Sequence, residues 1–273
     1  MADSDDLKVG YLCACFLGRR LRNDAWDASL PNPALTHILR QLDAIERCAT
    51  VISRVTFVCN MTPDSADQEQ AFKEVQKLIT SRKLRTDIRW EAVRRQNHNI
   101  SYGAWAWGLK GIYSDFDYVF TIEDDYVPDH VGFDQEVIQR YFSDEDAKEN
   151  VVKAASLWAD DTLFEHDRNQ GSRALRGGMP HAAISNGVVN VSVYAKVAEG
   201  FRLRSPPITG QGDFRTNPDW NALQMGYLKN HTDAGYRVIN MGQHYSAPFV
   251  DTAHGRYSFG ALDGPALFVP VEW

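Results

Sequence analysis

The sequence predicts a single α/β domain with a mixed, mostly parallel central sheet flanked by helices. Short apolar runs alternate with segments of helical periodicity through the first half of the chain, a pattern typical of parallel sheets. The length of 273 residues fits one large domain, and neither an internal repeat nor a linker is visible. Hydrophobic residues make up 44% and charged residues 24%, proportions that argue for an ordinary folded protein.

The first elements follow from local patterns. Residues 8–17 are a short apolar run with cysteines and aromatics, which predicts a buried strand. After an irregular stretch rich in Arg and Pro, apolar side chains recur at helical spacing over 34–48 and predict a helix. Residues 51–60 repeat the strand pattern, and 65–82 form an amphipathic helix.

The alternation continues with a third strand over 88–93, a helix over 101–113 and a compact apolar strand over 118–122. The later part is expected to contain a helix over 133–142, a strand near 151–157 and a helix over 220–230. Short strands are expected over 182–193 and 237–241, and the polar, Gly- and Arg-rich residues 160–178 are expected to form a mobile loop.

Composition limits the function classes. The formal net charge is -7, which argues against nucleic acid as a partner because phosphate backbones need a basic face. The four cysteines fit neither a zinc ribbon nor a redox pair, so we expect them to be buried and reduced. The start of the chain is acidic and no apolar run approaches ~18 residues, so we expect a cytoplasmic protein without a transmembrane segment.

Three successive carboxylates, Glu123, Asp124 and Asp125, follow the apolar strand directly. In open α/β sheets, ligands bind beyond the carboxyl ends of the strands, so this position favours a site. Like charges at a strand end repel each other, which indicates a bound cation, and oxygen ligands select Mg²⁺ or Mn²⁺. The alternative is a solvated acidic turn before Pro128.

A basic, Asn-containing turn stands upstream, with Arg94, Arg95 and Asn97, and a small-residue helix start follows it. Together with the acidic triplet, this order resembles the family 2-like glycosyltransferases of the GT-A fold. The resemblance implies a metal-binding DxD motif at 123–125 that holds the diphosphate of a nucleotide sugar. The family usually opens this triplet with Asp, so Glu123 is a departure from its pattern.

The resemblance also implies roles for individual residues. Asp125 and Glu123 would bind the metal, with Asp124 directed towards the ribose or the metal. A histidine beyond the last helix is often a third ligand in the family, and His244 takes this place, with His254 as the second choice.

The remaining implied residues bind the donor or activate the acceptor. Arg94, Arg95 and Asn97 would contact the nucleotide sugar, and Gly18 and Arg19 would contact the nucleotide. Asp219 is the candidate base, with Asp213 as a rival and a helix cap as the structural alternative.

The function that this resemblance implies is a metal-dependent inverting glycosyltransferase. It would move a sugar from a UDP-, GDP- or dTDP-linked donor to a carbohydrate or glycoconjugate hydroxyl. Residues 7–128 would bind the nucleotide sugar and residues 129–273 the acceptor. Three alternatives remain open: a nucleotidyltransferase, a non-catalytic nucleotide-sugar-binding module, and a glycoside hydrolase, which needs neither metal nor nucleotide.

Overall fold

The computed structural model describes the chain in several stretches. These are residues 7–18, 33–97, 100–124, 127–128, 130–143, 154–156, 187–200, 238–240, 245–246, 257–259 and 268–270. None of the helices within these stretches is long and apolar enough to cross a membrane.

The order of the elements along the chain is an alternation of strands and helices in the first half. The strands are β1 Val9–Phe16, β2 Ile52–Met61, β3 Arg89–Gln96, β4 Tyr118–Glu123, β5 Val127–Pro128, β6 Ala154–Ser156, β7 Gly187–Asn190, β8 Val238–Asn240, β9 Tyr245–Ser246, β10 Tyr257–Phe259 and β11 Phe268–Pro270. The helices are α1 Pro33–Cys48, α2 Ala66–Ser81, α3 Ile100–Gly111, α4 Phe133–Ser143 and α6 Val191–Gly200.

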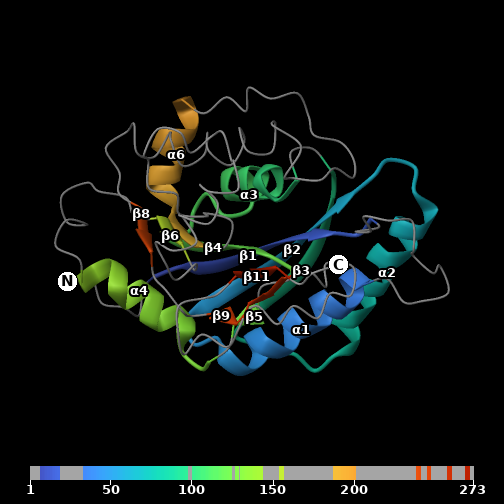
Figure 1. The fold of residues 1–273 in the computed structure, drawn as a ribbon, viewed down its shortest axis with the longest axis horizontal. Coiled ribbons are helices and arrows are strands. Elements are labelled where there is room, and N and C mark those ends of the chain that lie inside the picture. Colours follow the sequence, from blue (N-terminus) through green and yellow to red (C-terminus); the bar gives the residue numbers. More distant parts are fainter. Residues whose placement is uncertain are drawn as a thin grey trace.

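Seven strands form the central sheet in the order β3-β2-β1-β4-β7-β6-β8. Strands β1 to β4 are mutually parallel, β7 is antiparallel to both of its neighbours, and β6 and β8 are parallel to each other. Helices cover both faces of this sheet (Figure 1), with α1, α2 and α4 on one side and α3 and α6 on the other. The fold is therefore the mixed, mostly parallel α/β architecture that the sequence predicts.

Each face of the sheet has its own apolar core. Val55 and Phe57 of β2 pack with Leu42 of α1 and Phe133 of α4 on the first face. On the second, Trp105 of α3 packs beside Leu12 and Val119 together with residues of α6. We call these the α1 face and the α3 face.

Most predicted elements are present, but one was misread. The expectation of β structure over 182–193 is wrong at its end, because β7 stops at Asn190 and α6 begins at Val191. The side chain of Asn190 accepts hydrogen bonds from the Ser192 hydroxyl at 2.8 Å and the Val193 amide at 3.3 Å, which is how a residue caps a helix start. The expected loop over 160–178 and helix over 220–230 lie outside the described residues.

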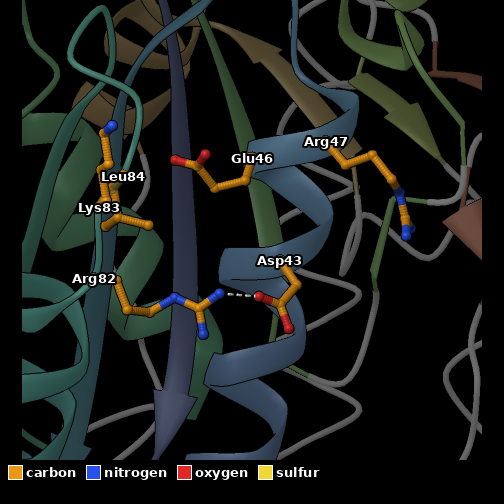
Figure 2. Close-up of a pocket in the computed structure, with 6 residues that line it drawn as sticks. All are labelled: Asp43, Glu46, Arg47, Arg82, Lys83 and Leu84. Carbon is orange, nitrogen blue, oxygen red and sulfur yellow. Dashed lines mark hydrogen bonds and ion pairs between the residues drawn. The ribbon is translucent and has the colours of Figure 1, made fainter.

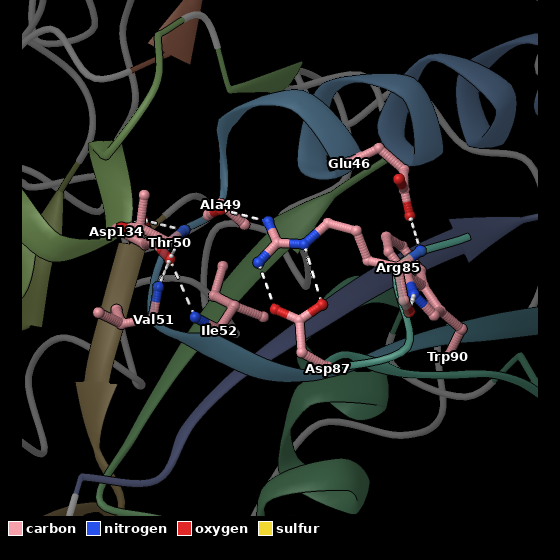
Figure 3. A network of polar contacts seen from close by, with 9 residues as sticks. All are labelled: Glu46, Ala49, Thr50, Val51, Ile52, Arg85, Asp87, Trp90 and Asp134. Atoms are coloured by element: carbon pink, nitrogen blue, oxygen red, sulfur yellow. Dashed lines mark hydrogen bonds and ion pairs between the residues drawn. The ribbon is translucent and has the colours of Figure 1, made fainter. Parts of the chain in front are cut away.

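The start of α4 is fixed to the connection between α1 and β2 by a buried carboxylate (Figure 3). Asp134 accepts hydrogen bonds from the backbone amides of Thr50, Val51 and Ile52, at 2.8, 2.7 and 3.0 Å, and from the Thr50 hydroxyl at 2.8 Å. On the other side of the same connection, Arg85 donates to the Ala49 carbonyl. This connection is thus held from two elements that are far apart in the sequence.

Close packing of β1 against the end of α3 leads to a stability prediction. A Cβ on Gly10 would lie 2.3 Å from Cε1 of Tyr113, whose hydroxyl is held by the Thr56 hydroxyl at 2.8 Å and the Tyr11 carbonyl at 2.9 Å. The ring has no easy way to move, so Gly10→Ala is expected to lower the free energy of unfolding by about 2 kcal/mol. Urea denaturation measures this change.

Gly111, at the end of α3, is the matched control for this substitution. A Cβ on Gly111 meets no atom within 4 Å, so Gly111→Ala is expected to leave stability unchanged or raise it by up to about 1 kcal/mol. Equal stability of the Gly10→Ala and wild-type proteins would contradict the packing described here.

Candidate active site at the carboxyl edge of the sheet

The carboxyl ends of β1 to β4 meet at one edge of the sheet because these four strands are parallel. Backbone hydrogen bonds join the residues that follow them. The amide of Leu17 donates to the Asn60 carbonyl at 3.2 Å, and the amide of Asn97 donates to the Met61 carbonyl at 2.8 Å. The amide of Asp124 donates to the Ala14 carbonyl at 3.1 Å. Several predicted site residues therefore share this edge, which is where ligands bind in open α/β sheets.

Glu123 is the last residue of β4, and Asp124 is the first residue of the turn that follows. Glu123 pairs in register with Ala14 on the α3 face, where its Oε1 accepts a hydrogen bond from the Ser101 hydroxyl at 2.8 Å. Ser101 stands at the start of α3. The half-buried Glu123 carboxylate is therefore oriented by the helix that follows the basic turn.

Asp124 is only 2% exposed. The charge of Asp124 contributes to the raised pKa values of two buried thiols. Burial is the main cause for Cys13, and a hydrogen bond with Cys15 is the main cause for Cys59. All four cysteines are free and buried, which confirms the sequence prediction. The contact of Asp124 with the ribose or the metal stays a prediction.

The two arginines of β3 have different environments. Arg94 is exposed and forms an ion pair with Glu69 of α2 at 3.3 Å, on the α1 face. Arg95 aligns with Asn60 of β2 and donates to its Oδ1 at 2.8 Å. Burial lowers the pKa of Arg95 from its usual value. A guanidinium so placed favours an anionic ligand nearby.

Asn97 is 6% exposed, and its Oδ1 finds no hydrogen-bond donor in the structure described. A buried acceptor without a partner costs about 1–3 kcal/mol, so this oxygen would gain from an N–H or O–H donor at the carboxyl edge. Gly18 stands at the same edge after β1, and a Cβ there would lie 2.1 Å from the ring of Phe16. A larger residue at this position would therefore require the Phe16 ring to shift.

Several predicted site residues lie outside the described part of the chain: Arg19, Asp125, Asp213, Asp219, His244 and His254. Among the residues that are described, no group of three His, Cys, Asp or Glu side chains is arranged to hold a metal ion. One strand pairing concerns the segments next to two predicted metal ligands, Asp125 and His244. Pro128 of β5 pairs with Tyr245 of β9, the residue directly after His244, and Val127 follows Asp125 by two positions.

A separate hollow of about 490 Å³ lies between α1 and the connection from α2 to β3. Its lining is mixed in charge (Figure 2), with Asp43 of α1 paired to Arg82 and with Glu46, Arg47, Lys83 and Leu84 around them. The end of α1 and the approach to β3 both adjoin the amino ends of the strands, so this hollow lies away from the carboxyl edge. We assign it no role.

We call the segment that begins at Glu123 and Asp124 the acidic turn. Sequence reasoning missed two residues that hydrogen-bond to it, Ser101 and Gln41. Gln41 is buried in α1 and donates from Nε2 to the carbonyl oxygens of Glu123 and Asp124, at 3.4 and 3.2 Å. Gln41 stands three residues after Ile38 and four before Ile45, on the apolar stripe of its helix. A polar residue on this stripe indicates a buried side chain, which is the signal by which Gln41 could have been found.

The sequence matches no protein-family profile and no curated protein. The structure is similar to several solved structures. One is the mannosyltransferase PcManGT from Pyrobaculum calidifontis in complex with GDP-Man and Mn²⁺, with 11% identity over 88% of this chain and 58% of that chain, and a TM-score of 0.47.

Two others match most of both chains. The 4-diphosphocytidyl-2C-methyl-D-erythritol synthase from Anaerococcus prevotii has 12% identity over 89% of each chain and a TM-score of 0.44. Mouse xyloside xylosyltransferase 1 has 9% identity over 85% of each chain and a TM-score of 0.41. At scores below 0.5 these similarities establish neither a family nor an activity.

Proposed function

We propose that this chain is a glycosyltransferase that moves a sugar from a nucleotide-diphosphate sugar to a hydroxyl of a glycan or glycoconjugate, with inversion at the anomeric carbon. One observation carries the proposal. On the α3 face of the carboxyl edge, the Arg95–Asn60 pair stands on β3 and β2 and the Glu123 carboxylate stands on β4. The Arg95–Asn60 pair is suited to binding a nucleotide, and the Glu123 carboxylate is suited to binding a cation.

The chemistry of the donor groups fits a hard divalent ion, Mn²⁺ or Mg²⁺, on the Glu123 side of the edge. Glu123 offers a carboxylate on the α3 face, whereas Asp124 is buried. Asp125 and His244 are the proposed further ligands, and the pairing of β5 with β9 brings their flanking segments together. A bound ion would stabilise the negative charge that develops on the departing diphosphate.

The chain's own groups supply the remaining chemistry of this proposal. The Arg95 guanidinium attracts the diphosphate, and the Asn97 Oδ1 accepts a hydrogen bond from the nucleoside. Asp219 takes the proton of the acceptor hydroxyl, which then attacks the anomeric carbon as the bond to the diphosphate breaks. One displacement of this kind inverts the anomeric configuration.

Thermal unfolding with UDP, GDP and dTDP, each with and without MnCl₂, tests the proposal. A nucleotide at about 100 times its Kd adds about 2.7 kcal/mol to the native state, which raises Tm by roughly 5–10 °C. We expect such a shift with one nucleotide. Its Mn²⁺-dependent part should disappear in Glu123→Gln and Asp125→Ala. It should persist in Glu74→Gln, which alters a half-buried carboxylate on α2.

The absence of a shift with every nucleotide would refute the proposal. Where a nucleotide binds, the products separate the two transferase classes. Release of a nucleoside diphosphate from the sugar nucleotide, together with a glycosylated acceptor, supports sugar transfer. Formation or consumption of pyrophosphate instead identifies a nucleotidyltransferase.

A further inference from the structure

Gln41 is a fully buried polar residue in the middle of α1, with hydrogen bonds to two other elements. Its Oε1 accepts from the Tyr11 hydroxyl at 2.7 Å. Its Nε2 donates to the carbonyl oxygens of Asp124 at 3.2 Å and Glu123 at 3.4 Å. Because carbonyl oxygens only accept hydrogen bonds, they fix which end of the Gln41 amide faces the acidic turn.

The two carbonyls belong to consecutive residues, which is informative about the backbone. Along an extended strand, successive carbonyls point in opposite directions, so one amide group reaches both only where the strand has begun to turn. Gln41 is thus bound at the point where β4 ends and the carboxylates begin. The Asp124 amide is held from the other side by the Ala14 carbonyl of β1.

We propose that Gln41, oriented by Tyr11, is a positioning residue that sets the backbone of the acidic turn and thereby the direction in which its carboxylates present to the cation and the nucleotide sugar. This inference rests on the proposed function. Gln41 touches neither ligand in this scheme. It acts through the carbonyls of Glu123 and Asp124, and Tyr11 acts through Gln41.

Gln41→Met tests the role because it keeps the length and volume of the side chain but removes both the donor and the acceptor. The carbonyls of Glu123 and Asp124 then lose a buried donor, and the turn is free to open. Tyr11→Phe is a milder second variant. It leaves the carbonyl contacts in place and removes only the group that orients the amide, so its effects are expected to be smaller.

Tyr113→Phe is the matched control. It also removes a buried tyrosine hydroxyl bonded to β1 and β2, but on the α3 face near the middle of these strands and not at the carboxyl edge. Its loss of hydrogen bonds is comparable to that in the other variants. A general loss of stability would therefore appear in all three proteins, whereas an effect on the acidic turn would spare Tyr113→Phe.

Two measurements on the 273-residue chain test this role. Amide hydrogen exchange of the peptide covering 118–128, in the ligand-free protein, is expected to speed up about tenfold in Gln41→Met and to stay unchanged in Tyr113→Phe. The Kd for Mn²⁺ in the presence of UDP or GDP is measured from the electron paramagnetic resonance signal of free Mn²⁺. It is expected to rise about tenfold in Gln41→Met, to rise less in Tyr11→Phe and to stay unchanged in Tyr113→Phe.

The outcomes distinguish the positioning role of Gln41 from the proposed glycosyltransferase function. Unchanged exchange in Gln41→Met, or faster exchange with unchanged Mn²⁺ affinity, would overturn the positioning role while leaving the proposed function intact. If the wild-type chain binds neither Mn²⁺ nor nucleotide, the proposed function fails. The positioning role then fails with it, whatever the exchange data show.

Discussion

Asp134→Ala is expected to lower the free energy of unfolding by about 4 kcal/mol. The carboxylate is completely buried and accepts hydrogen bonds from three consecutive backbone amides and one hydroxyl. Alanine removes the carboxylate acceptor and leaves these donors without a partner in the interior. Urea denaturation followed by circular dichroism measures the change.

Glu136→Ala, in the same first turn of α4, is the control for Asp134→Ala. Glu136 is exposed, and its Oε2 lies 3.0 Å from Nε2 of His130, so a change below about 1 kcal/mol is expected. If the two substitutions had similar effects, the anchoring role of Asp134 would be wrong.

Arg95→Met is expected to weaken binding of the nucleoside diphosphate by about 30-fold, because it removes the half-buried cation of the carboxyl edge and its bond to Asn60. Arg95→Lys should recover only part of this affinity, since an ammonium does not reproduce the planar fork of a guanidinium. Isothermal titration with UDP or GDP in the presence of Mn²⁺ measures both constants.

Arg94→Met is the control for Arg95→Met, one residue away on the same strand. It changes the net charge by the same amount but removes an exposed pair with Glu69 on the opposite face of the sheet. Its affinity should therefore remain within about twofold of wild type. An equal loss in both variants would indicate a long-range effect of net charge and would contradict the specific role of Arg95.

The fold was predictable wherever hydrophobic periodicity is strong. The apolar spacing in α1 and α2 and the compact apolar run of β4 placed these elements within a few residues of their observed bounds. The start of α6 was not predictable in this way. Val191 and Val193 are β-branched and follow the strand β7 directly, so local propensity favoured a longer strand, while the cap supplied by Asn190 ended it.

The sequence predicts which strand ends form the candidate site, but not which side chains at those ends face it. The sequence does not reveal which of two adjacent arginines faces the site, because that depends on the pleat of β3 and its register with β2. Nor does it reveal that Asp124 is buried while Glu123 is half-buried and bonded to Ser101. Gln41 was missed because one polar residue within an apolar stripe has many possible partners in tertiary structure.

The order of strands in the sheet has a consequence for synthesis of the chain. Strands β1 to β4 are complete once Glu123 has been made, yet β4 borders β7, which begins only at Gly187. At ~5–20 residues per second, the ribosome needs roughly 3–13 s to make the residues between them. During that time the outer edge of β4, an apolar strand that contains Val119 and Phe120, is unpaired and can pair with other nascent chains. This strand is therefore the segment to which a chaperone would be expected to bind.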